Sequence, residues 1–153
     1  MSIRIEQNFQ VDQPSDQVWD FLVDPERVVD CLPGAKLIEV IDDRTFKGEI
    51  GVRLGPIGVS FVGTIHFDEL DRDAGRVIMS GEGKDRRGTG AVRMRMESIL
   101  SPSSDGGTAV AVSQEIELTG RLASFGRGSV MTSVADMMFG RFTGCVQEKL
   151  ASA

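Results

Sequence analysis

The chain has 153 residues and a net charge of −6, and 41% of its residues are hydrophobic while 26% are charged, which is typical of one globular domain spanning residues 1–153. The negative net charge disfavours a broad nucleic-acid-binding surface, which would need clustered lysines and arginines to contact phosphates. The first residues contain no apolar signal core, and the longest nearly apolar run, 57–63, is far shorter than the roughly 20 residues that span a bilayer, so we expect a soluble, cytoplasmic protein.

The first predicted element is a strand at 3–11, where apolar and polar residues alternate. A short helix is predicted to follow from Pro14, because proline suits the first turn and the next apolar residues share one helical face. A second short helix is predicted with Asp24 as its N-terminal cap and Pro25 at its first position. The Pro-Gly pair at 33–34 ends this helix.

From residue 36 onward the apolar residues recur at every second position, which is typical of strands. Six strands are predicted, at 36–41, 45–54, 59–70, 76–83, 91–100 and 108–118. Between 123 and 151 the apolar residues recur every four positions instead, which predicts one long amphipathic helix. Each strand has an apolar face that needs cover, so this order predicts an α+β fold in which a curved antiparallel seven-stranded sheet surrounds the C-terminal helix.

The glycine-rich stretch 81–90, GEGKDRRGTG, contains Gly83 and Gly88 at the spacing of a phosphate-binding loop. Such a loop needs a lysine after the second glycine, and then a helix whose N–H groups meet the phosphate. Here Thr89 occupies the lysine position and an alternating strand follows. The stretch is therefore interpreted as a charged hairpin tip and not as a nucleotide site.

No catalytic residue is predicted. The single histidine, His66, is expected on the polar face of its strand, and neither an inward-facing pair of carboxylates nor a serine-histidine-aspartate set is found. Cys31 and Cys145 lie far apart in the sequence, and no histidine or cysteine cluster indicates a metal site. Two buried free thiols are the preferred interpretation in a reducing cytosol, with a disulfide left open.

Methionines on the strands and on the long helix are predicted to face one another, and such flexible thioethers suit an adaptable apolar cavity. Glycines on the same strand faces are expected to leave room for a ligand. The predicted cavity walls are Trp19, Phe46, Phe61, Ile65, Met79, Met94, Met96, Gln114, Met131, Met138 and Phe142. The predicted cavity rim is Lys84, Asp85, Arg86 and Arg87.

Several segments of the chain resemble CoxG, a family of small proteins associated with carbon monoxide dehydrogenase. They are FQVDQPSDQVWDFLVDPERVVDCLPGA, FKG, GPIGVSFVG, GEGKDRRGTG and LTGRLASFGRG. The resemblance runs from Phe9 to about Leu150, and DCLPG and GRLASFGRG are its most specific parts. It implies the helix-grip fold of the START-like superfamily, which includes the birch pollen allergen and polyketide cyclases.

The same resemblance implies a function. Relatives accompany molybdenum-containing dehydrogenases, and they help to attach the enzyme to the membrane or carry a quinone or lipid in the START-like cavity. We therefore expect a non-enzymatic accessory protein without a covalent cofactor, whose partners are a hydrophobic small molecule, a molybdenum-containing dehydrogenase and the inner face of the membrane. A protein adaptor with a packed cavity and a cyclase-like or hydrolytic enzyme are the alternatives, and the oligomeric state, including a homo-oligomer, is left open.

Overall fold

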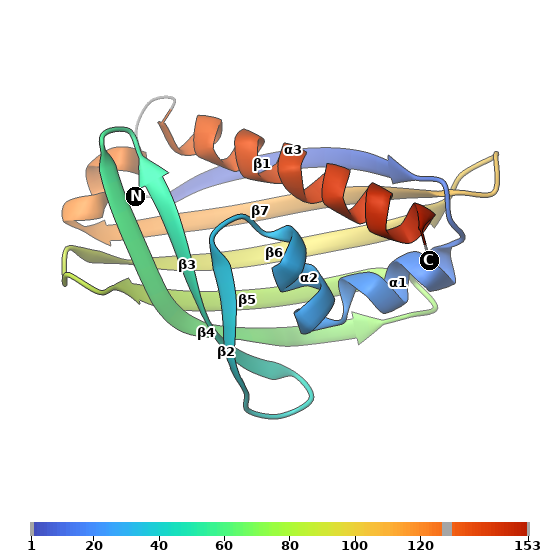
Figure 1. Cartoon of the computed structure of the whole chain (residues 1–153), viewed down its shortest axis with the longest axis horizontal. Helices are drawn as coiled ribbons and strands as arrows, with labels where there is room; N and C mark the ends of the chain where they lie inside the picture. Colours follow the sequence, from blue (N-terminus) through green and yellow to red (C-terminus); the bar gives the residue numbers. More distant parts are fainter. Residues whose placement is uncertain (1, 127–129, 153) are drawn as a thin grey trace.

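An antiparallel sheet of seven strands runs the length of the protein in this computed structural model, which describes residues 2–126 and 130–152 (Figure 1). The strands are β1 (Ser2–Val11), β2 (Ala35–Val40), β3 (Thr45–Leu54), β4 (Ile57–Asp71), β5 (Arg76–Asp85), β6 (Gly90–Pro102) and β7 (Thr108–Gly120). Their order in the sheet is β1-β7-β6-β5-β4-β3-β2. The first and second strands of the chain therefore form the two opposite edges.

The helices follow the predicted order, with one correction at the start of the last helix. They are α1 (Ser15–Leu22), α2 (Pro25–Cys31), the 3-10 helix η1 (Arg121–Gly126) and α3 (Val130–Ala151). The side chain of Asp24 accepts a hydrogen bond from the backbone N–H of Glu26 at 3.0 Å, which confirms the predicted cap of α2.

The prediction of one continuous helix from residue 123 is wrong, because residues 123–126 belong to η1. Glycine weakens a helix interior, and Gly126 ends η1, so the apolar period alone places the start of the long helix too early. Residues 127–129 of the predicted helix lie outside the described residues.

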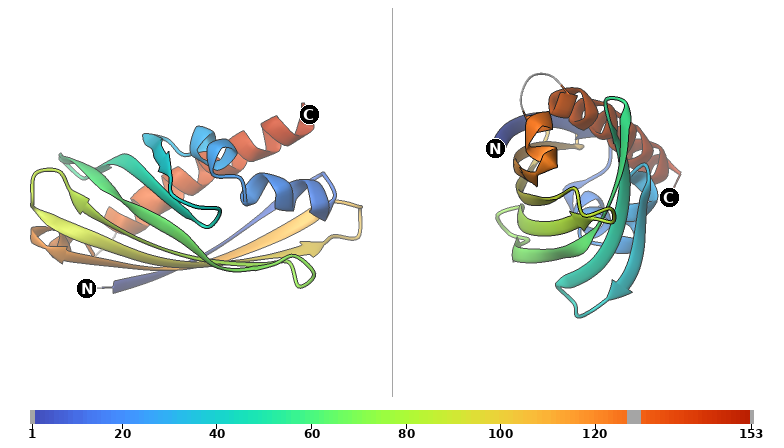
Figure 2. Two further views of the ribbon diagram at one scale, coloured as in Figure 1. Left: turned by 90° about the horizontal axis from the view of Figure 1, so that it is seen from below. Right: turned by 90° about the vertical axis from the view of Figure 1, so that its left-hand side faces the viewer.

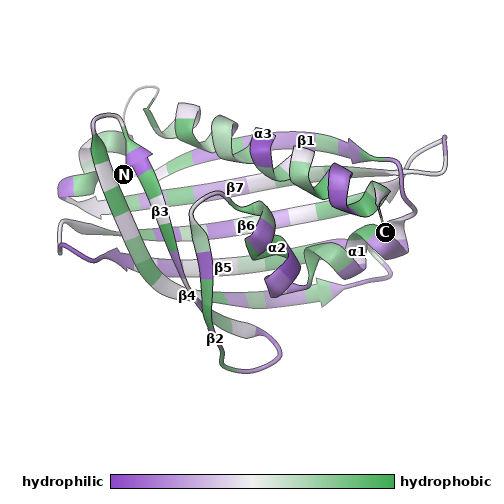
Figure 3. Cartoon of the chain, viewed as in Figure 1, coloured by the Kyte–Doolittle hydropathy of each residue, from purple (hydrophilic) through white to green (hydrophobic). Residues whose placement is uncertain are grey.

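The curved sheet partly surrounds α3, which lies along its concave, inner face, while α1 and α2 lie at one end of that face (Figures 1 and 2). The rings of Phe9 on β1 and Phe139 on α3 lie 5.6 Å apart in an edge-to-face contact, which identifies the inner face of β1. The pairing of each strand with its neighbour identifies the residues of the other strands that point to the same inner face. Hydrophobic and hydrophilic residues alternate along the strands, as expected when one face is covered and the other is not (Figure 3). This is the expected helix-grip arrangement.

Two groups of buried side chains pack on the inner face. The closed-end core lies where α1 and α2 meet the C-terminal half of α3, and it consists of Phe9, Val11, Val18, Trp19, Phe21, Cys31, Phe46, Phe67, Val77, Leu100, Val110, Val112, Val146 and Leu150. The tip core lies beside η1 and the start of α3, and it consists of Leu54, Val59, Phe61, Leu118, Leu122 and Met131. The inner face is therefore tightly packed at both ends.

A disulfide between Cys31 and Cys145 joins α2 to α3, with their Cα atoms 5.4 Å apart. The preferred interpretation of two free thiols is therefore wrong. The two cysteines are separated by 114 positions in the sequence, and only the packing of α2 against α3 brings them together. The disulfide fastens both helices at the closed-end core.

A row of paired glycines crosses three strands: Gly48 on β3 pairs with Gly63 on β4, and Gly63 pairs with Gly83 on β5. A Cβ atom on Gly63 would overlap the carbonyl oxygen of Glu82 and lie 2.5 Å from the Cα atom of Gly83. The expectation that these glycines leave room for a ligand is not met at Gly63. Its missing side chain lets the backbones of β4 and β5 approach closely instead.

Candidate functional site

The middle of the inner face, between the two cores, is incompletely covered. Ile65 on β4, Met94 on β6 and Met138 on α3 are half-buried and belong to neither core. The registers turn Ile65 and Met94 inward, as predicted. Met138 lies on one helical face with Val134, which packs against the tip core, and Phe142, which packs against the closed-end core. We call this region, defined by Ile65, Met94 and Met138, the central section.

Gly81 on β5 lies within the central section, where it pairs with Ile65 on one side and Met94 on the other. A Cβ atom at Gly81 would lie 2.5 Å from Cδ1 of Ile65 and 3.6 Å from Cε of Met94. Both side chains therefore lean over the glycine. Unlike the backbone atoms beside Gly63, these ends of side chains can rotate, so the surface of the central section is adaptable.

The predicted wall residues fall in three environments. The buried ones are Trp19 and Phe46 in the closed-end core and Phe61 and Met131 in the tip core. Partly buried ones that pack against the closed-end core are Met79, Met96 and Phe142. Those that belong to neither core are Ile65, Met94, Gln114 and Met138. The candidate site therefore narrows to the last group and its partly buried neighbours.

A chain of polar side chains, which we call the glutamine relay, links the inner face of the sheet to α3. Nε2 of Gln114 on β7 donates a hydrogen bond to Oε1 of Gln7 on β1 at 3.3 Å, and Nε2 of Gln7 donates to Oδ1 of Asp136 on α3, also at 3.3 Å. Sequence reasoning selects Gln114 but misses its two partners. The available signal was the position of Gln7, which interrupts the inward-facing apolar series between Ile5 and Phe9.

A family model for CoxG, described as a subunit of carbon monoxide dehydrogenase, matches residues 8–151. The chain belongs to this family. The match covers nearly the whole chain and confirms the resemblance seen in the sequence. No curated protein matches the chain.

Solved structures share the fold of this CoxG-family protein. A conserved protein from Geobacillus kaustophilus is 20% identical with a TM-score of 0.85, and the match covers 98% of this chain and 96% of that chain. The Zhui aromatase/cyclase from Streptomyces sp. R1128 is 12% identical with a TM-score of 0.69, covering 97% and 93%. A START superfamily protein from Mycobacterium smegmatis is 9% identical with a TM-score of 0.64, covering 97% of each chain. Likeness at these identities establishes the START-like fold alone.

The turn between β5 and β6 contains the predicted rim residues, and Asp85 organises it. Asp85 is only 5% exposed. Its carboxylate accepts hydrogen bonds from the hydroxyl of Thr89 and from the backbone N–H groups of Ser60 and Arg87. The hydrogen bond from Thr89 is the largest of the causes that hold the pKa of Asp85 below its usual range. Asp85 therefore fixes the shape of the hairpin tip, which is the turn that the sequence predicts.

The other predicted rim residues are exposed, and one of them is held in place. The guanidinium of Arg86 donates two hydrogen bonds to the carboxylate of Glu49 on β3, at 3.0 and 2.9 Å. This contact is the main cause of the lowered pKa of Glu49. Lys84 and Arg87 lie free of any ion pair in the part of the chain that the structure describes. The role of all four as a ligand rim stays a prediction.

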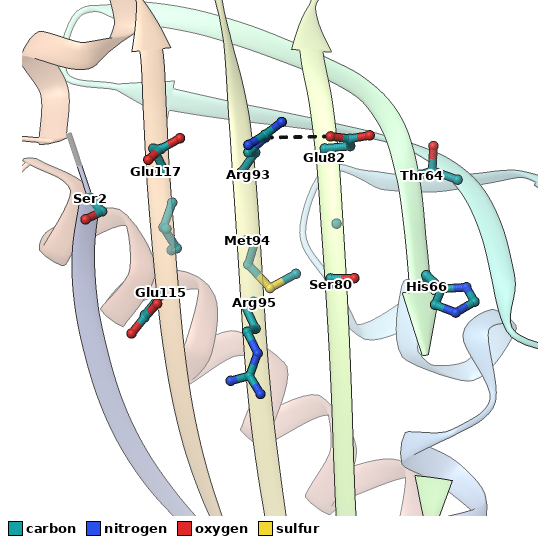
Figure 4. A pocket seen from close by; sticks show the side chains of 12 residues that line it. Ser2, Thr64, His66, Ser80, Glu82, Arg93, Met94, Arg95, Glu115 and Glu117 are labelled. Carbon is teal, nitrogen blue, oxygen red and sulfur yellow. Dashed lines mark ion pairs between the residues drawn. The ribbon is translucent and has the colours of Figure 1, made fainter. Parts of the chain in front are cut away.

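A polar hollow of about 560 Å³ lies on the outer face of the sheet, on the side opposite α3 (Figure 4). It is lined by Ser2, Thr64, His66, Ser80, Gly81, Glu82, Arg93, Met94, Arg95, Glu115, Ile116 and Glu117. Arg93 and Glu82 form an ion pair of 3.7 Å across two strands. His66 is exposed here, with Nδ1 2.9 Å from Oγ1 of Thr45, so its predicted outward orientation is confirmed. The sheet itself lies between this hollow and the central section.

Within residues 2–126 and 130–152, no group of three or more histidine, cysteine, aspartate or glutamate side chains is placed to bind a metal ion. No helix among the described residues has the length and apolar character needed to cross a bilayer. Exposed apolar side chains occur at the edge strand β2 and just after it, at Ile38, Val40 and Ile41.

Proposed function

We propose that this CoxG-family protein is a non-enzymatic carrier that holds a mainly apolar molecule, a quinone or a lipid, in the central section, between the sheet and α3. The observation that carries the proposal is the partial exposure of Ile65, Met94 and Met138, three large, half-buried apolar side chains that belong to neither core. Covering apolar surface is worth about 25 cal/mol per Å². A ligand lying on these side chains would gain this energy, and flexible methionines would adapt to its shape.

Native mass spectrometry of gently purified protein, followed by titration with menaquinone, tests the carrier function. We expect a co-purified apolar molecule or saturable binding of menaquinone. Met138→Gln should weaken binding, because it places a polar amide against the ligand. Met137→Gln is the matched control on the same helix, since Met137 is already 45% exposed. No bound molecule and no menaquinone binding would refute the carrier function.

The carrier is further proposed to serve a molybdenum-containing dehydrogenase at the membrane. Membership of the CoxG family supports the choice of enzyme. The exposed side chains of Ile38, Val40 and Ile41 support a peripheral contact with a membrane or partner surface, because large apolar groups gathered at one site favour association.

Affinity capture of the dehydrogenase and flotation with lipid vesicles test these two contacts. Replacing Ile38, Val40 and Ile41 together by serine should weaken one contact or both, while Met137→Ser is the control for a single exposed apolar side chain elsewhere. Capture of the dehydrogenase by a protein that binds no small molecule would favour the alternative, an adaptor with a packed interior. Absence of both contacts would refute the accessory role.

A further inference from the structure

The glutamine relay has a fixed direction. The carboxylate of Asp136 accepts hydrogen bonds only, so the end of Gln7 that faces it must be the NH₂ group. The carbonyl oxygen of Gln7 then faces Gln114, and Gln114 must present its own NH₂ group to that oxygen. The carboxylate on α3 therefore sets the orientation of both amides.

This direction leaves hydrogen-bonding groups of Gln114 available beside the central section. One N–H of its amide is used by Gln7, and the other N–H and the carbonyl oxygen make no hydrogen bond among the described residues. The side chain of Gln114 is half-buried on the inner face, directly opposite Met96 on β6 and Ile5 on β1. A polar amide in apolar surroundings gains by finding a partner, and water or a ligand must supply it.

The charges on the inner face decide what kind of partner fits. Among the described strand residues, the inward positions carry no lysine or arginine, and Asp85 at the hairpin tip is the acidic residue among them. A carboxylate or phosphate placed beside Gln114 would lose its hydration without gaining a cation. Asp136 at the far end of the relay would also repel it. An uncharged polar group avoids both the uncompensated loss of ionic hydration and the repulsion by Asp136.

We infer that Gln114 recognises an uncharged hydroxyl or carbonyl group at the polar end of the apolar ligand. The remaining N–H of Gln114 donates to a ligand carbonyl, and its carbonyl oxygen accepts from a ligand hydroxyl. The apolar part of the ligand then lies on Ile65, Met94 and Met138. This inference deepens the proposed carrier function and rests on it, because it assigns a ligand class to the same site.

Isothermal titration calorimetry with three probes of equal chain length tests the inference. Dodecan-1-ol carries a hydroxyl, 1-chlorododecane carries no hydrogen-bonding group of comparable strength, and dodecanoate is an anion. We expect the wild-type protein to bind the alcohol most tightly. Gln114→Leu should weaken binding of the alcohol about 2- to 10-fold, which is the range expected for one hydrogen bond, and change the affinity for 1-chlorododecane less than 2-fold.

Two further variants separate recognition from folding. Gln114→Leu leaves the carbonyl oxygen of Gln7 unpaired, so the double variant Gln7→Leu/Gln114→Leu removes both amides and should show the same selective loss. Gln10→Leu is the control, because Gln10 lies on the same strand as Gln7, β1, but on its outer face. Thermal unfolding confirms that each variant is folded.

The outcomes distinguish this inference from the function on which it rests. If the wild-type protein binds neither menaquinone nor any of the three probes, the carrier function fails. If it binds menaquinone but does not bind dodecan-1-ol more tightly than 1-chlorododecane, the inference about Gln114 fails and the carrier function stands. If it binds the probes but both Gln114 variants keep the wild-type affinity for dodecan-1-ol, Gln114 does not recognise the polar end, and the carrier function stands. Tighter binding of dodecanoate than of the alcohol would overturn the uncharged ligand class.

Discussion

The closed-end core and the central section lie on the same face of the same sheet, yet they are covered differently. At the closed-end core, α1, α2 and α3 all contribute side chains, and Val18, Phe21 and Val146 are completely buried. At the central section α3 is the helix that lies over the sheet, and Ile65 and Met94 remain half-buried. An alternating strand therefore provides an apolar surface, and the helices that lie above it decide whether that surface is fully buried or stays partly exposed.

The largest effect that separates the two regions is expected from shortening one side chain in each. Phe21→Ala removes a fully buried ring from the closed-end core, and it should lower the free energy of unfolding by about 3–5 kcal/mol. Met94→Ala removes a side chain that already touches solvent, and it should cost no more than about 1–2 kcal/mol. Urea denaturation measures both values.

The comparison would break if Met94→Ala cost as much as Phe21→Ala, because the central section would then be packed core. The affinity for menaquinone should rank the two variants in the opposite order. Met94→Ala should weaken menaquinone binding, whereas Phe21→Ala should leave the affinity of its folded fraction unchanged. A loss of affinity in both variants would mean that the ligand contacts the closed-end core.

The second effect concerns the disulfide, which lies in the closed-end core alone. Cys31→Ala/Cys145→Ala should lower the free energy of unfolding by about 2–4 kcal/mol, because it frees a long loop in the unfolded chain. Ligand affinity at the central section should stay within about 2-fold, since the stabilisation acts mainly on the unfolded state. Titration of thiols in the denatured wild-type protein, without reductant, checks the bond itself, and two free thiols would contradict it.

The two-residue period of the strands correctly predicted the face of nearly every strand residue that matters here. Ile65 and Met94 turn inward and His66 turns outward, because alternation alone fixes the face once one face needs cover. Predicting which inward residues remain uncovered was harder. That property depends on where α1 and α2 end. The sequence therefore predicts Trp19 and Phe46 as cavity walls, whereas the structure buries both in the closed-end core.

Contacts between segments distant in the sequence escaped prediction for a common reason. Cys31 and Cys145 come together because α2 packs against α3, and Gln7 and Asp136 come together because α3 lies along the curved sheet. No local pattern encodes such distances. Gly63 illustrates the same limit, since a glycine on an inward face has the same sequence signature whether it leaves space or brings two backbones together.

The smallest effect is expected from adding one methyl group at each of two glycines. It tests whether a glycine leaves free space or lets two backbones approach closely. Gly63→Ala forces a Cβ atom onto the backbone of β5 beside the central section, and it should lower the free energy of unfolding by about 1–3 kcal/mol. Gly140→Ala adds the same methyl group within α3, where a Cβ atom would meet nothing within 4 Å beyond its chain neighbours and the helix's own backbone. It should raise the free energy of unfolding by about 1 kcal/mol through helix propensity. Urea denaturation of both variants gives the two signs. If Gly63→Ala were neutral, the backbones of β4 and β5 could separate there, and the floor of the central section would be as adaptable as the side chains above Gly81.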